Sequence, residues 1–152
     1  MKLDLCLQSR STLPMPGPRV FARHEVDELI TSLEEILLDL ENHRAQLQEL
    51  KIRINALEMI WGEALRDDSC ADHGEFKSHM AEMEKIQGYF KSCADKIAEM
   101  GGQVKGLNPP LVDFYGVQDG HLVFWCWTQG ERTIDHWHHI DEGFADRQPV
   151  IH

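Results

Sequence analysis

Residues 26–64 read VDELITSLEEILLDLENHRAQLQELKIRINALEMIWGEA and carry apolar side chains at alternating steps of three and four residues. An α-helix turns every ~3.6 residues, so this spacing places the apolar side chains on one face of a helix. We expect that helix to run unbroken from about residue 24 to about residue 67. The seam, which only His43 interrupts, consists of Val26, Leu29, Leu33, Ile36, Leu40, His43, Leu47, Leu50, Ile54, Leu57, Trp61 and Ala64.

A second, shorter seam with the same helical spacing follows, and it consists of Phe76, His79, Met83, Ile86, Phe90, Cys93, Ile97 and Met100. The polar segment 68–71 separates the two seams, and Gly101-Gly102 is a typical helix stop. We therefore expect an antiparallel, coiled-coil-like helical hairpin over residues 21–102. Because the second helix is the shorter one, the seam over residues 26–40 is left uncovered. Either the C-terminal segment or another copy of the protein must bury it.

The C-terminal segment has the two-residue periodicity of β-strands. Three strands are expected at residues 111–117, 121–127 and 131–137, separated by Asp119-Gly120 and Gln129-Gly130. Two-residue turns at both places predict a three-stranded antiparallel meander with a fixed register. In this register Asp113 faces Cys126, and Cys126 faces Thr133. Both faces of the meander carry large apolar side chains, which predicts that both are covered.

The predicted fold class is α+β, with the hairpin at residues 21–102 and the meander at residues 103–152 packed on the long helix in the same domain. Residues 1–20 are expected to form a loose N-terminal tail, because Pro14, Pro16 and Pro18 interrupt helices. A content of 42% hydrophobic residues in 152 is enough for one folded core.

Charge and cysteine usage narrow the class of partner. A formal net charge of −11 repels phosphate backbones and anionic lipids, so we expect neither nucleic acid nor a membrane as partner. No apolar run is long enough for a transmembrane helix, and no signal peptide is expected. The four cysteines form no CxxC pair, which favours reduced thiols and a cytoplasmic location.

Several Trp, Gly and charged positions follow one another in a specific order, namely Gly106-Leu107, Leu111-Val112-Asp113-Phe114, Gly120, Cys126-Trp127, Gly130-Glu131, Trp137-His138, Gly143-Phe144, Arg147 and Pro149. This order resembles the C-terminal signature of domain-of-unknown-function family 2203, and the similarity extends over about residues 21–151. The resemblance implies a prokaryotic protein with no established activity, and it brings no catalytic residue, cofactor or substrate. His121, His136 and His139 are not part of the family pattern.

The histidines of the meander are the sharpest chemical candidates. In the predicted register His121 lies opposite His138, and His136 points to the same face. Opposed side chains on neighbouring strands are close enough for His121, His136 and His138 to hold zinc, with Asp141 or Glu142 as a further ligand. The alternative is that His138 is a hydrogen-bonded core residue and that the other two lie at the surface.

A second group of polar residues could support general acid–base chemistry, since it places carboxylates beside a histidine. This group consists of Glu131, Arg132, Asp135, His138, Asp141 and Arg147. Its alternative is structural, with Arg147 pairing with Asp141, Glu142 or Asp113 to hold the C-terminus on the sheet. The candidate functional surface consists of Asp113, Trp127, Glu131, Trp137, His138 and Arg147.

No nucleophile motif or phosphate-binding loop is present, so the sequence favours a non-catalytic protein without a cofactor. The preferred hypothesis is a cytosolic interaction or scaffold protein that acts as a homo-oligomer, with a homodimer or another protein as partner. The alternative is a metal-binding protein or a small metal-dependent hydrolase that uses the histidine cluster with zinc.

Overall fold

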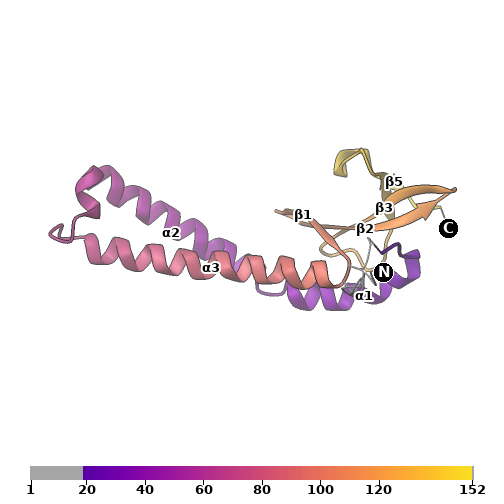
Figure 1. Ribbon diagram of the computed structural model, residues 1–152, viewed down its shortest axis with the longest axis horizontal. Helices are drawn as coiled ribbons and strands as arrows, with labels where there is room; N and C mark the ends of the chain where they lie inside the picture. Colours follow the sequence, from indigo (N-terminus) through magenta and orange to yellow (C-terminus); the bar gives the residue numbers. More distant parts are fainter. Residues whose placement is uncertain (1–18, 152) are drawn as a thin grey trace, which may run out of the picture.

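A computed structural model describes residues 19–151, so residues 1–18 of the predicted tail lie outside the described residues. The protein is α+β, as the sequence predicts. Its helices are α1 (Arg23–Ile36), α2 (Leu40–Trp61), the short 3-10 helix η1 (Gly62–Arg66) and α3 (His73–Glu99). Figure 1 shows α2 and α3 side by side as a hairpin that extends away from the sheet, while α1 lies under the sheet.

The predicted long helix is wrong in one respect, because it is broken between α1 and α2. Leu37, Leu38 and Asp39 form a turn in which Leu40 donates its backbone N–H to the Leu37 carbonyl. Leu37 is buried while Leu38 is exposed. The break contains no proline or glycine, and the apolar spacing continues through it, so periodicity alone does not reveal it. It allows α1 to follow the sheet while α2 follows α3.

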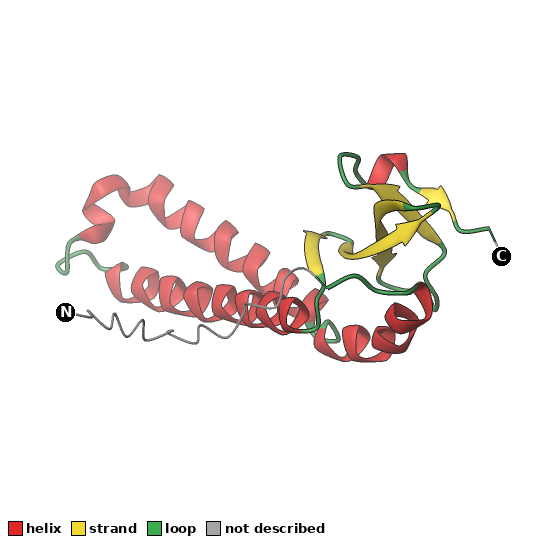
Figure 2. Ribbon diagram, turned by 45° about the vertical axis from the view of Figure 1, so that its right-hand side comes forward, coloured by secondary structure: helices red, strands yellow, loops and turns green. Residues whose placement is uncertain are grey.

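The sheet has five strands rather than the predicted three, in the order β1-β2-β3-β4-β5 and antiparallel throughout. The strands are β1 (Gln103–Leu107), β2 (Pro110–Gln118), β3 (His121–Thr128), β4 (His136–His139) and β5 (Gln148–Pro149). The second 3-10 helix, η2 (Phe144–Asp146), lies between β4 and β5. Figure 2 shows the η2 segment and α1 on opposite sides of the sheet.

The first predicted hairpin is confirmed, and the second is wrong. Asp119 and Gly120 have φ of 51° and 77°, as a type I′ turn requires, and Asp113 pairs with Cys126 as predicted. At the second turn only Gly130 has a positive φ, which is the type II pattern. A type II turn splays the strands that it joins, so the chain leaves β3 after this turn. The third predicted strand accordingly begins at His136, and not at residue 131.

Residues 131–135 are held by other contacts before β4 begins. The backbone N–H of Ile134 donates to the carboxylate of Asp27 on α1 at 2.6 Å. The indole N–H of Trp127 donates to the carbonyl oxygen of Glu131 at 2.9 Å. Ile134 itself is fully buried in the core. The carboxylate on α1 therefore replaces a strand partner for this segment.

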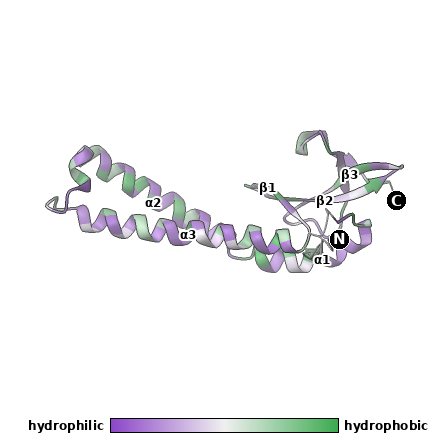
Figure 3. Ribbon diagram, viewed as in Figure 1, coloured by the Kyte–Doolittle hydropathy of each residue, from purple (hydrophilic) through white to green (hydrophobic). Residues whose placement is uncertain are grey.

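The inner face of the sheet covers the part of the first seam that lies in α1. Val26 and Leu33 are completely buried, in one cluster with Phe114 and Trp127. Of the two coverings considered for residues 26–40, the sheet is the one present, and the end of α3 joins it, because Ile97 lies in the same cluster and the thiol of Cys93 lies 3.5 Å from the Ile36 carbonyl. The expectation that the second helix leaves this part uncovered is therefore wrong. This half of the seam gives no support for a second protomer. Hydrophilic and hydrophobic residues alternate along α2 and α3 (Figure 3). No described helix is long and apolar enough to cross a membrane.

Candidate metal centre

Three ionisable side chains meet on the outer face of the sheet, which lies opposite α1. Asp113 comes from β2 and Cys126 from β3, and the two are direct cross-strand partners. His138 on β4 pairs with Phe124, two residues from Cys126 along β3, so its side chain lies on the same face. Three neighbouring strands thus bring a carboxylate, a thiol and an imidazole together.

Hydrogen bonding fixes the orientation of the His138 ring. Its Nδ1 lies 2.8 Å from the carbonyl oxygen of His139, and its Nε2 lies 3.0 Å from Oδ2 of Asp113. A carbonyl oxygen can only accept, so Nδ1 carries a hydrogen and Nε2 is the atom that interacts with the carboxylate. Asp113 and His138 are only 3% and 2% exposed. They form a buried acid–imidazole pair.

The second carboxylate oxygen, Oδ1 of Asp113, is buried and accepts no hydrogen bond from the described residues. Buried polar atoms nearly always have a partner, because leaving one unpaired costs about 1–3 kcal/mol. The unpaired oxygen belongs to the group formed by Asp113, Cys126 and His138, whose possible ligand atoms all lie within 4.8 Å of one another. The arrangement offers three converging donor atoms of different chemistry.

Cys126 is not an activated nucleophile. Burial, reinforced by the Asp113 carboxylate, raises the pKa of its thiol to about 12, although the nearby Arg147 acts in the opposite direction. The thiolate is the reactive form of cysteine, so this thiol is inert near neutral pH. Moreover, Nδ1 of His138 is bonded to a backbone carbonyl and Nε2 to Asp113, so neither nitrogen is oriented as a base toward the sulfur.

An ion pair lies next to the three residues. Arg147 donates to Oε1 of Glu131 at 3.2 Å, and both side chains are largely buried. His136 lies 3.5 Å from the same oxygen through its Nδ1, which makes no hydrogen bond within residues 19–151. Glu131 is anchored by its second oxygen, which accepts the backbone N–H of Thr128. Arg147 therefore pairs with Glu131, and not with Asp141, Glu142 or Asp113 as the sequence suggested.

A cavity of about 240 Å³ opens beside the three residues. It is smaller than the pockets of about 300–1,000 Å³ that hold drug-sized ligands. Besides Asp113, Cys126 and His138, its lining consists of Lys105, Leu111, Phe124, Ile140, Glu142, Gly143 and Phe144. Apolar walls and two side chains of opposite charge thus surround the donor atoms.

The predicted histidine cluster does not assemble among the described residues. His121 pairs with Gln118 next to the β2–β3 turn, and His138 lies opposite Phe124 instead of His121. The cause is the displaced start of β4, which shifts the register of this strand against β3. His136 and His138 do share one face, as predicted, but it is the face of Asp113 and Cys126, whereas the predicted register put them on the opposite face. The donor atoms nearest to His138 are those of Asp113 and Cys126.

The predicted functional surface is divided between the two faces of the sheet. Asp113 and His138 line the cavity, and Glu131 and Arg147 form the adjacent ion pair. Trp127 is buried in the core cluster on the inner face, and Trp137 packs against that cluster. Cys126, the third member of the group with Asp113 and His138, is absent from the predicted functional surface. The correct pairing of Asp113 with Cys126 was the signal that could have placed it in the site.

The chain matches the family described as "Uncharacterized conserved protein (DUF2203)" over residues 19–150. The match covers most of the chain, so the protein belongs to this family, and the resemblance found in its C-terminal segment is confirmed. No curated protein and no solved structure matches the chain.

Proposed function

We propose that this DUF2203 protein binds a transition-metal ion, with zinc as the leading candidate, between Asp113, Cys126 and His138. The observation that carries the proposal is the buried Oδ1 of Asp113, to which no described residue donates a hydrogen bond although it belongs to a group with a thiol and an imidazole. An ion bound there would satisfy this oxygen.

The chemistry of the donor set favours zinc. Zinc accepts thiolate, imidazole and carboxylate ligands together, whereas magnesium and calcium prefer oxygen alone. Ligand bonds of about 2.0–2.3 Å would require the three side chains to move slightly closer together. A centre with three protein ligands keeps a fourth position open, here toward the cavity. With a water in that position, the centre would resemble that of a small metal-dependent hydrolase.

The surrounding charges are consistent with a divalent ion. Asp113 and Glu131 bring two negative charges, and Arg147 brings one positive charge. With a neutral His138 the net charge of these residues is −1. One additional proton shared by Asp113 and His138 would bring this net charge to zero in the metal-free protein. A divalent ion that replaces this proton and the thiol proton of Cys126 would give the same neutral total. Arg147 would then stabilise the thiolate.

The competing interpretation is that the three residues form a structural polar cluster without a metal. Zinc affinity separates the two, measured by competition with a chromophoric chelator on protein without a histidine tag. We expect about one zinc per chain, and Cys126→Ser, Asp113→Asn and His138→Ala should each weaken binding by roughly tenfold or more. Circular dichroism would establish that each variant stays folded.

Two control variants make the test specific. His121→Ala removes a histidine that lies apart from the proposed centre, and Cys93→Ser removes a buried thiol in α3. Both should retain full affinity. The proposal is wrong if folded wild-type protein shows no zinc binding tighter than that of the His138→Ala variant. A loss in His121→Ala equal to that in His138→Ala would instead favour the cluster of His121, His136 and His138.

A non-catalytic interaction role as a homo-oligomer stays a second proposal. It no longer rests on the first seam, because the sheet covers the part of that seam in α1. Its support now comes from exposed apolar side chains on α2, away from the sheet.

A further inference from the structure

The outward face of α2 carries a second stripe of uncharged residues. Ile52, Met59 and Ile60 are 60%, 88% and 69% exposed, although they are large and apolar. At 100° per residue Ile52 and Met59 fall on the side of α2 opposite its buried residues, and Ile60 falls at the edge of that side. The outward stripe consists of Ala45, Gln48, Ile52, Asn55, Ala56, Met59 and Ile60, all of them exposed.

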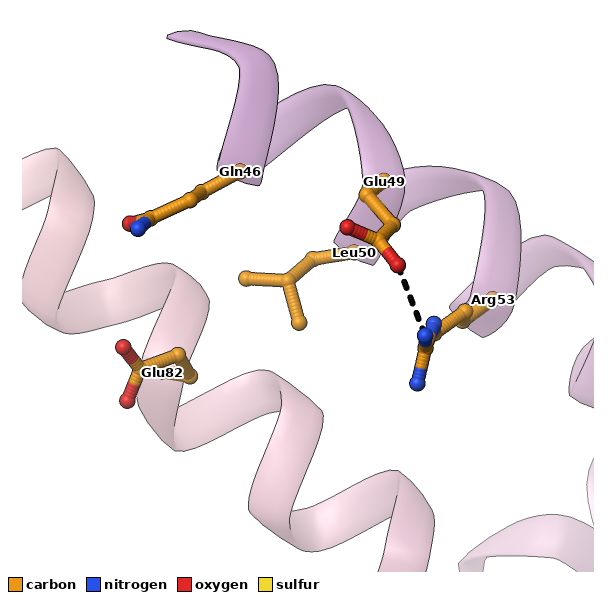
Figure 4. A pocket seen from close by; sticks show the side chains of 5 residues that line it. All are labelled: Gln46, Glu49, Leu50, Arg53 and Glu82. Atoms are coloured by element: carbon orange, nitrogen blue, oxygen red, sulfur yellow. Dashed lines mark hydrogen bonds and ion pairs between the residues drawn. The ribbon is translucent and has the colours of Figure 1, made fainter. Parts of the chain in front are cut away.

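The outward stripe is distinct from the contact between α2 and α3. Leu50, Ile54 and Leu57 are the buried residues of α2 that face the hairpin interior. Figure 4 shows Leu50 pointing toward α3, with the ion pair between Glu49 and Arg53 at the side of the helix. The oxygen–nitrogen distance of this pair is 2.6 Å. The outward stripe lies beyond that side, where no described residue covers Ile52 or Met59.

The spacing of the outward stripe is that of a coiled-coil seam. Ala45, Gln48, Ile52, Asn55 and Met59 follow one another at steps of three, four, three and four residues. Such a repeat keeps one face of a helix against a second helix over two heptads. These five positions carry no charged side chain in a chain with 27% charged residues, although Glu41 lies one step before Ala45 and Glu49 lies at the edge of the stripe. An uncharged, partly apolar face of this kind is a candidate contact surface.

We propose that the outward stripe binds the same stripe of a second copy of this protein, with the two α2 helices antiparallel. A two-fold axis makes such a contact self-complementary. In the register that places Ile52 against the partner's Asn55, Met59 lies against the partner's Gln48. Both contacts then occur twice around the axis.

Charge complementarity favours this occupant and this register. Lys51 lies beside the outward stripe, and in the antiparallel register it faces the partner's Glu58. The two-fold axis produces the same pair a second time. Both side chains occupy flanking positions of the repeat, where charge pairs set partner choice and orientation. Glu58 also pairs with Arg66 of its own chain at 3.5 Å, and its side chain stays 40% exposed there. Antiparallel hairpins also direct the two sheets to opposite ends of the assembly, because each sheet lies beyond the start of its own α2.

Gln48 and Asn55 make the outward stripe only partly apolar, and polar seam residues reduce the stability of a coiled coil. The dimer is accordingly reversible, with a dissociation constant on the order of micromolar. Light scattering of the full-length chain over a concentration series should show a rise from one to two chain masses. Ile52→Lys should shift the midpoint upward by at least about tenfold, since it places two charges in the seam.

The matched control is Leu38→Lys. Leu38 is 76% exposed in the turn before α2, but it lies outside the outward stripe. This variant should dimerise like the wild type. A loss of the dimer in Leu38→Lys as well would show that added charge acts nonspecifically, and it would remove the assignment to the stripe.

A charge exchange tests the register itself. Lys51→Glu and Glu58→Lys should each weaken the dimer, because each variant places like charges opposite one another twice. The double variant K51E/E58K restores both pairs with reversed signs and should recover the wild-type midpoint. A monomer at all accessible concentrations overturns the proposal. So does a dimer that is insensitive to Ile52→Lys, or a double variant that is weaker than either single one.

Discussion

The indole Nε1 of Trp125 donates a 2.9 Å hydrogen bond to the carbonyl oxygen of Phe21, 104 residues earlier in the chain. The backbone N–H of Phe21 donates in turn to the carbonyl of Tyr115 at 2.7 Å. The indole lies over Gly116, which leaves the space for it. These two hydrogen bonds connect the residues just before α1 to β2 and β3. They set the position of α1 against the inner face of the sheet.

Gly116→Ala should destabilise the protein, because the added Cβ would collide with Nε1 of Trp125. Overpacking of this kind typically costs about 1–3 kcal/mol. Gly88→Ala is the matched control, since nothing lies within 4 Å of a Cβ at this position in α3. It should stabilise the helix by about 0.5–1 kcal/mol. Urea unfolding measures both changes, and equal effects of the two variants would contradict the close contact.

Trp125→Ala should cost roughly 3–5 kcal/mol, because Trp125 is 4% exposed in the core. Trp125→Phe keeps most of the buried ring but leaves the Phe21 carbonyl unpaired, so we expect a loss of about 1–3 kcal/mol. Leu38→Ala, at a highly exposed side chain, should stay within about 0.5 kcal/mol. A loss below about 1 kcal/mol for Trp125→Ala would mean that water reaches the inner face of the sheet.

The sequence predicts those parts of the fold that local chemistry decides. Asp119-Gly120 can adopt two successive positive φ values, so it determines a hairpin and the register of β2 against β3. Gln129-Gly130 can form a type II turn as readily, and the contact of Ile134 with Asp27 on α1 decides between the two. That contact joins residues 107 positions apart. No local pattern contains it.

The candidate site also depends on the contact between Ile134 and Asp27. Asp113 and Cys126 meet because the register of the first hairpin is local, and that part of the site follows from the sequence. His138 joins them only because β4 starts at His136, after the segment held by α1. The predicted register placed His138 opposite His121, which produced a cluster of three histidines. The sequence names Asp113 and His138 as candidates and pairs Asp113 with Cys126, but it does not bring His138 to the other two, because that depends on the contact between Ile134 and Asp27 on α1.

The carboxylate of Asp27 should contribute measurably to stability. Asp27→Ala leaves the backbone N–H of Ile134 without its acceptor in a partly buried position, at a cost of about 1–3 kcal/mol. Glu34→Ala serves as the control, because Glu34 accepts an exposed N–H from Gly130, which water can replace. Hydrogen exchange of the Ile134 amide should accelerate in the Asp27 variant alone. An unchanged exchange rate would contradict the role assigned to this contact.

Tyr89 should make stability fall at alkaline pH. Burial, followed by the neighbouring Cys93, raises the pKa of Tyr89 to about 12, and the ring stacks on His43 at 3.8 Å between centroids. An unfolded tyrosine ionises near pH 10, so the contribution is present below about pH 10 and is lost between about pH 10 and pH 12. Tyr89→Phe should reduce this loss in urea unfolding curves. An identical pH dependence in both proteins would show that the folded chain does not resist ionisation of Tyr89.

Zinc binding should release about two protons per ion. One comes from the thiol of Cys126, whose raised pKa keeps it protonated in the free protein. The other is the hydrogen between Nε2 of His138 and Oδ2 of Asp113, which the ion would replace. Titration of zinc into weakly buffered protein with a pH indicator counts the protons directly. Cys126→Ser should release about one proton fewer, while Cys93→Ser should match the wild type. Binding without proton release would place the ion at surface carboxylates instead, since these are already ionised near neutral pH.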